Sequence, residues 1–147
     1  MIAEINALFS RDLNKLVKEI TLYSNEENIW LTDKNIANSA GNLVLHLVGN
    51  LNTYIGAMLG NTGYIRNRDL EFSQKGIPRA ELIDKIKNTI LVVNSSLSSL
   101  SDEDAKKEFP ELVYEHKTSI EYLLISLAMH LGYHLGQVNY HRRLLDI

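Results

Sequence analysis

Apolar residues recur at three- and four-residue spacing in four long segments, and no segment alternates apolar and polar residues. A spacing of three and four places apolar side chains on one face of an α-helix, whereas a half-buried strand needs a period of two. The pattern therefore predicts an all-α chain, with helices at residues 2–24, 39–60, 78–100 and 119–145.

Local signals predict where these helices begin and end. Ser39 is a suitable N-cap for the second helix, and Gly60 suits its end. Pro78 suits the first position of the third helix, where its missing N–H costs nothing. Thr118 and Glu121 have the spacing of a capping box before the fourth helix. The three connections are long enough to cross a bundle, so these residues alone leave the helix topology open.

The polar connections and the glycines give further expectations. Residues 24–38 are predicted to form a loop anchored by Trp30, and residues 60–77 a charged loop rich in turn residues. Gly49 and Gly56 lower the helix propensity of the second helix, so we expect them to permit close contact with a neighbouring helix.

Composition narrows the class of protein. The chain has 147 residues, 45% of them apolar and 22% charged, which fits a single domain over residues 1–147. Its net charge of -3 gives no basic face for nucleic acid. It has no Cys, which excludes disulfides and a thiol nucleophile from the chain itself. No signal peptide is apparent, and no segment reaches roughly 18 uncharged apolar residues. We expect a cytoplasmic protein without nucleic-acid or membrane partners.

Histidines stand out against this ordinary composition. His130 and His134 lie one turn apart in an apolar part of the fourth helix, and Gln137 and His141 continue the same line. His46 lies within an apolar run of the second helix. Burying an imidazole without a partner costs roughly a few kcal/mol. These side chains therefore need bonding partners.

A shared metal ion is one explanation. Two His at positions i and i+4 can bind one divalent cation. The HExxH zinc proteases use this spacing, but Leu131 follows His130 here, so their Glu base is missing. His46 as a third ligand would leave one position open, which is typical of catalytic zinc, although nickel, iron and copper also accept imidazoles. Asn50 and Gln137 are placed to orient an imidazole or a metal-bound water.

Simpler interpretations stay open for each of these residues. A single HxxxH pair is weak evidence, because a His on an apolar face often bonds a backbone carbonyl or a hydroxyl. Asn50 and Gln137 could equally form a hydrogen bond between helices. We expect His141, near the chain end, to face solvent, and we assign no role to His116.

Two arginines in the 60–77 loop have a similar pair of interpretations. Arg66 and Arg68 could bind an anionic group of a cofactor, since guanidinium pairs well with carboxylates. They could instead pair with Asp69 or Glu71 and order the loop.

Three motifs together resemble the DinB-like superfamily of helical metalloproteins. They are SAGNLVLHLVGNLNTYIGAMLG, GYIRNRDLEF and MHLGYHLGQVNYHRRLL, and the resemblance extends over essentially the whole chain. The signature of that family is one His on the second helix and HxxxH followed by Gly-Gln on the fourth. His46, His130, His134 and Gln137 match it. Tyr133 departs from it, because many members have a further His before the second ligand of the pair.

The resemblance implies a four-helix bundle with up-down-down-up topology, a divalent metal (Zn or Ni) bound by the three His, and a homodimer. Some relatives are transferases or isomerases that use bacillithiol or mycothiol. In those proteins the metal lowers the pKa of the thiol. The function it implies is transfer of a low-molecular-weight thiol to a small electrophile. A metal-dependent hydrolase and a non-catalytic, stress-related module for metal binding or dimerisation are the alternatives.

Overall fold

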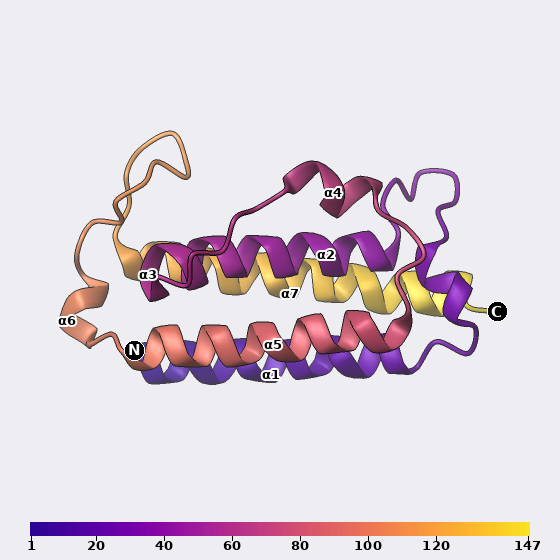
Figure 1. The fold of residues 1–147 in the computed structure, drawn as a ribbon, viewed down its shortest axis with the longest axis horizontal. Helices are drawn as coiled ribbons and strands as arrows, with labels where there is room; N and C mark the ends of the chain where they lie inside the picture. Colours follow the sequence, from indigo (N-terminus) through magenta and orange to yellow (C-terminus); the bar gives the residue numbers. More distant parts are fainter.

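The computed structural model describes all 147 residues and contains helices but no strands, which confirms the predicted all-α class (Figure 1). Four long helices dominate it: α1 (Ile2–Thr21), α2 (Ala40–Leu51), α5 (Arg79–Ser98) and α7 (Ile120–Leu145). Helix α2 continues through a π-helical segment, η2 (Asn52–Ala57), into α3 (Met58–Gly60). The connections contain the 3-10 helix η1 (Glu26–Trp30) and two short helices, α4 (Arg68–Ser73) and α6 (Asp102–Ala105).

The long helices lie side by side, and each of α1 and α2 packs against both α5 and α7. In Figure 1, α1 and α7 run from left to right, and α2 and α5 run from right to left. Only the connection over residues 61–78 therefore has to cross the length of the molecule. It carries α4 over the outer side of α2, against which α4 packs. This cover explains why all but one of the residues of α2 are buried.

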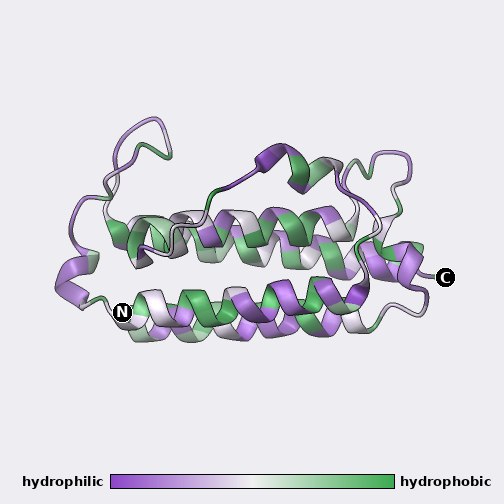
Figure 2. Ribbon diagram, viewed as in Figure 1, coloured by the Kyte–Doolittle hydropathy of each residue, from purple (hydrophilic) through white to green (hydrophobic).

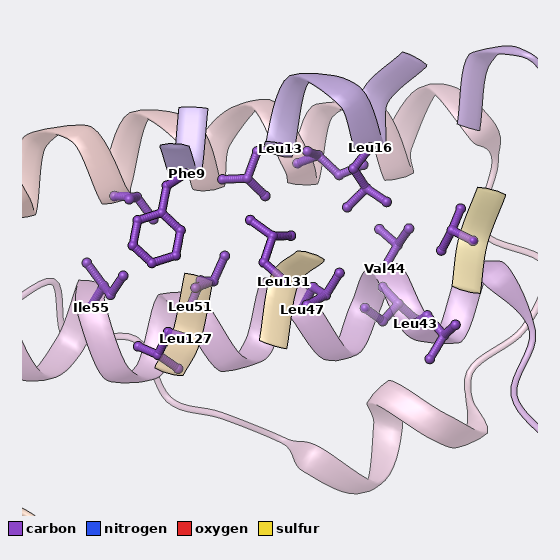
Figure 3. Close-up of a cluster of buried hydrophobic side chains, with 14 of the residues drawn as sticks. Phe9, Leu13, Leu16, Leu43, Val44, Leu47, Leu51, Ile55, Leu127 and Leu131 are labelled. Carbon is purple, nitrogen blue, oxygen red and sulfur yellow. The ribbon is translucent and has the colours of Figure 1, made fainter. Parts of the chain in front are cut away.

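The core lies between the four long helices and contains 28 buried hydrophobic residues. In α1, the buried residues Phe9, Leu13 and Leu16 follow the predicted three- and four-residue spacing. Figure 3 shows them pointing toward Leu47 of α2 and Leu131 of α7. Burying a side chain of this size contributes about 1.5–3 kcal/mol. The long helices accordingly mix hydrophobic and hydrophilic residues along their length (Figure 2).

The start of α7 differs from the prediction. Ser119 is the N-cap, and its hydroxyl accepts a hydrogen bond from the N–H of Tyr122 at 3.1 Å, so the proposed Thr118 capping box is wrong. The reason is a backbone pairing: the Thr118 carbonyl accepts from the N–H of Phe109 at 2.8 Å. This pairing holds Thr118 outside the helix, which begins at Ile120.

The other predicted boundaries hold within three residues. Ser39 caps α2 as expected, since its hydroxyl accepts from the N–H of Asn42 at 3.1 Å. Pro78 is the N-cap of α5 rather than its first helical residue. Helix α1 ends at Thr21 instead of residue 24.

The predictions for Trp30, Gly49 and Gly56 can be compared with the packing. Trp30 anchors its loop against α2, because a Cβ added to Gly41 would come within 2.5 Å of the indole ring. Gly56 faces α5, where a Cβ would lie 2.9 Å from a side-chain atom of Val92. Gly49 instead faces a side chain of α4, not one of the long helices.

The segment Ala40–Gly60 is long and apolar enough to cross a membrane by length and composition alone. We expected no segment to reach this length and apolar content, and that expectation is wrong. The segment contains Asn, Thr and His, but the mean hydropathy of its most apolar stretch still reaches 1.2. In the fold, 56% of the most apolar stretch is buried inside the protein, as in a core helix. Length and composition are thus weak grounds for a membrane span.

Candidate metal centre

Three histidines from two helices converge on one point. His46 comes from α2 and His130 and His134 from α7, and their candidate ligand nitrogens all lie within 4.8 Å of one another. Nε2 of His130 lies 3.2 Å from Nε2 of His46 and 3.1 Å from Nε2 of His134. Tetrahedral zinc with N ligands at 2.0–2.1 Å would separate the nitrogens by about 3.3 Å. The spacing therefore suits one shared ion.

The core sets this convergence. Leu47, next to His46, and Leu131, next to His130, are almost completely buried and face the bundle interior. These leucines fix the rotation of α2 and α7 about their axes. Each helix then places its histidines at the edge of the α2–α7 contact. The four-residue spacing in α7 adds His134 one turn beyond His130.

A buried carboxylate holds the outer side of His46. Nδ1–H of His46 donates to Oε1 of Glu71 at 3.1 Å. Arg66 binds the same carboxylate with two hydrogen bonds, Nε to Oε2 at 2.8 Å and Nη2 to Oε1 at 2.9 Å. A proton on Nδ1 leaves Nε2 with its lone pair directed at the other histidines. A carboxylate in this position orients an imidazole and raises its basicity as a metal ligand.

His134 has a matching partner on its own helix. Its Nδ1–H donates to the side-chain oxygen of Gln137 at 2.7 Å. Nε2 of His134 therefore also carries a lone pair. A neutral His130 has only one ring proton to offer the Nε2 atoms of His46 and His134. Its own Nδ1 is buried without any hydrogen-bond partner. An arrangement with this excess of acceptors calls for a cation at its centre.

Burial keeps two of the three imidazoles in the form that metals bind. Burial lowers the pKa of His46, against the opposing effect of the hydrogen bond to Glu71. Burial lowers the pKa of His130 to about 4, with smaller contributions from His134, His46 and the nearby arginines. Both imidazoles are neutral at pH 7, as metal ligation requires.

The cluster is open on one side. His46 is buried, whereas His130 and His134 are partly exposed. Two aromatic rings flank the cluster: Phe72, with its ring centroid 5.1 Å from that of His46, and Tyr133, 5.2 Å from His134. Three protein ligands with solvent access leave space for a fourth ligand from outside.

Asn50 and Gln137, the two predicted orienting residues, lie in different environments. Gln137 bonds His134 as described above. Asn50 is buried, but its side-chain oxygen has no hydrogen-bond partner and it makes no bond to an imidazole. Of these two residues, only Gln137 is placed to orient one of the histidines.

His141 is not part of the cluster, and the expectation that it faces solvent is wrong. It is only 3% exposed. The hydroxyl of Tyr23 donates to its Nδ1 at 2.7 Å, and its Nε2–H donates to the Leu31 carbonyl at 2.8 Å. The connection after α1 folds over the end of α7 and buries it. His116 lies exposed in a loop, away from the other four.

Glu71 is the site residue that the sequence did not reveal. Its ion pair with Arg66 was one of two interpretations, but its bond to His46 was not predicted. The closest local signal is Gly49, three residues after His46. A Cβ there would lie 2.0 Å from Oε2 of Glu71, so only Gly admits the carboxylate in this position. Asn42 fixes the backbone of α4 by donating to the Glu71 carbonyl at 2.8 Å.

A family model described as "Protein of unknown function (DUF1572)" matches residues 3–146, a range that contains every residue of the cluster. No curated protein matches the chain.

Proposed function

We propose that this chain, which belongs to the uncharacterised DUF1572 family, is a metal-dependent enzyme that transfers a low-molecular-weight thiol to a small electrophile. The observation that carries the proposal is the convergence of three Nε2 atoms from His46, His130 and His134, two of which have their Nδ1 protons bonded outward. We propose zinc or nickel as the ion.

We also assign the chain to the DinB-like superfamily, with the up-down-down-up topology of its four-helix bundle. The directions of the long helices in Figure 1 support this assignment. The pairing of His46 with an HxxxH motif that leads into Gly136 and Gln137 supports it as well.

A bound divalent ion would lower the pKa of a coordinated thiol and supply a thiolate at neutral pH. The residues of the chain have supporting roles. Glu71 holds the proton of His46 on Nδ1, and Gln137 does the same for His134. Arg66 neutralises the Glu71 carboxylate. In the transfer, sulfur bonds to the electrophilic carbon, the leaving group departs with its electron pair, and the thiol proton passes to water.

Two alternatives use the same residues. In a metal-dependent hydrolase, a metal-bound water replaces the thiol. In a non-catalytic, stress-related module, the ion would only stabilise the fold or a dimer. The core argues against a purely structural ion, because its 28 buried hydrophobic residues pack without any contribution from the histidines. Unfolding on chelation would instead favour the structural role.

We further propose a homodimer formed through the outer face of α7. We define the α7 row as its large apolar residues with exposures between 46% and 71%: Tyr122, Ile125, Met129, Tyr133, Tyr140 and Leu144. At roughly 200 Å² per fully exposed side chain, the row presents on the order of 700 Å². A standard interface needs about 800 Å² per partner.

The charges of α7 favour a second copy in antiparallel orientation. No Asp, Glu, Lys or Arg lies between Glu121 at its start and Arg142 near its end. Antiparallel pairing of two α7 helices would place Glu121 beside Arg143 of the partner subunit at both ends of the interface. The uncharged rows of the two subunits would then pack against each other at the centre of the interface.

Metal analysis of untagged protein tests the proposed function. We expect one zinc or nickel ion per chain, with loss of the ion in His46→Ala, His130→Ala and His134→Ala variants that retain their helical circular dichroism. Metal-loaded protein should then consume an electrophile such as monochlorobimane together with bacillithiol or mycothiol. Well-folded wild-type protein that takes up neither ion would refute the proposal.

A further inference from the structure

We propose that a pocket beside the histidine cluster binds the uncharged, largely apolar body of this enzyme's small-molecule ligand. The proposal rests on the metal function proposed above. The pocket has a volume of about 360 Å³ and lies between the 35–38 loop, the first turn of α2 and the C-terminal half of α7. Ligand sites in proteins typically enclose about 300–1,000 Å³.

The pocket adjoins the cluster on both helices. Gln137 lines it and accepts the hydrogen bond from Nδ1 of His134. Leu43 lines it on α2, three residues before His46. One helical turn rises about 5.4 Å, so Leu43 lies within about one turn of His46 along α2. A ligand in the pocket is therefore close enough to extend a donor atom toward the open side of the cluster.

The lining indicates what kind of molecule fits. Ile36 and Leu43 contribute aliphatic side chains to the wall, as does Leu144, which also belongs to the α7 row and would contact the partner subunit in the proposed dimer. No Asp, Glu, Lys or Arg lines the pocket. A charged ligand would lose hydration there without gaining a countercharge. Amide groups of Asn35 and Asn38 provide hydrogen-bonding groups at the loop. This combination favours a neutral molecule with an aromatic or branched aliphatic body.

His141 also lines the pocket, but as part of the wall. Both of its nitrogens already bond, one to the hydroxyl of Tyr23 and one to the carbonyl of Leu31. It therefore has no free nitrogen with which to hold a second ion. The cluster is the only part of this region suited to coordinate a ligand atom.

The test uses cobalt(II)-loaded protein and two neutral probes that coordinate through the same nitrogen, 1-methylimidazole and 1-benzylimidazole. Binding is followed by the visible absorption of the cobalt. We expect 1-benzylimidazole to bind at least tenfold more tightly, because its benzyl group enters the pocket. A carboxylate on the benzyl ring should abolish this advantage.

A pair of matched variants locates the effect. Ala37→Trp fills the pocket and should reduce the benzyl advantage to less than threefold while the affinity for 1-methylimidazole stays unchanged. Ala7→Trp, at an exposed position of α1, should keep the full advantage. Cobalt-loaded protein that binds both probes equally, or an advantage that survives Ala37→Trp, overturns the pocket proposal alone. Protein that fails to bind cobalt overturns the proposed function, and the pocket proposal with it.

Discussion

The carboxylate of Glu71 accepts a hydrogen bond at 3.1 Å from Nδ1 of His46, 25 residues earlier in the chain. The bond links the crossing segment that carries α4 to a metal-ligand candidate on α2. It fixes the tautomer of His46, and with it the direction of the Nε2 lone pair. Metal affinity should therefore depend on a residue that does not touch the metal.

Replacing Glu71 tests this dependence. Glu71→Gln keeps the size of the side chain but removes the charge that polarises His46. We expect zinc affinity, measured by competition with a chromophoric chelator, to fall about 10- to 100-fold. Glu81→Gln, on the exposed side of α5, is the control and should bind zinc like the wild type. Unchanged affinity in Glu71→Gln would mean that the carboxylate only anchors α4.

Gly49 offers a second test of the same relationship from the side of α2. In Gly49→Ala the new methyl group would overlap the Glu71 carboxylate, which has to move away from His46. We expect weaker zinc binding, comparable to that of Glu71→Gln, together with retained helical content. Combining Gly49→Ala with Glu71→Gln should weaken zinc binding no more than either substitution alone, because both break the same contact between Glu71 and His46.

Gly136→Ala is the matched control for that substitution, since a Cβ there meets no atom within 4 Å. It should raise the unfolding free energy by about 0.5–1 kcal/mol through helix propensity alone, with unchanged zinc affinity. Equal losses of zinc affinity in both Gly variants would contradict the role given to Gly49.

The parts of the site that the sequence predicts are those fixed within single helices. The pairing of His130 with His134 follows from helical spacing, and so does the bond from His134 to Gln137 three residues later. His46 joins them because its apolar neighbours bury the same face of α2. These features depend only on helix periodicity and on the burial of leucines.

The features that the sequence did not predict depend on where connections fold in space. Glu71 reaches His46 only because residues 61–78 cross over α2. His141 is buried because the connection after α1 covers the end of α7. Thr118 is kept out of α7 by pairing with Phe109. None of these contacts leaves a periodic pattern in the sequence.

The proposed dimer predicts a selective effect of charge on the α7 row. Ile125→Glu places a carboxylate within the row, and in an antiparallel dimer each copy would be buried against uncharged residues of the partner's row without a countercharge. We expect the molar mass from light scattering to fall from dimer to monomer. Leu91→Glu, at an exposed apolar position of α5, should leave the dimer intact. A monomeric wild type at the same concentration would refute the proposed interface.

The stability of the metal-free protein should fall as the pH decreases from 7 to 5. Burial lowers the pKa values of His46, His130 and His141 below the ordinary value of 6.5. Below pH 6.5 the unfolded chain therefore binds protons that the folded chain does not. Linkage then makes the unfolding free energy decrease as the pH falls through this window, and for His130 the decrease continues to about pH 4.

Urea denaturation in the presence of a chelator measures this pH dependence. We expect the denaturation midpoint to be lower at pH 5 than at pH 7 in the wild type. His141→Gln retains a hydrogen-bonding side chain but cannot be protonated, so its midpoint should change less over the same interval. Because His141 lies outside the cluster, this variant should still bind zinc like the wild type at pH 7. A wild-type midpoint that is equal at pH 5 and pH 7 would show that these imidazoles are not held in their neutral form by the fold.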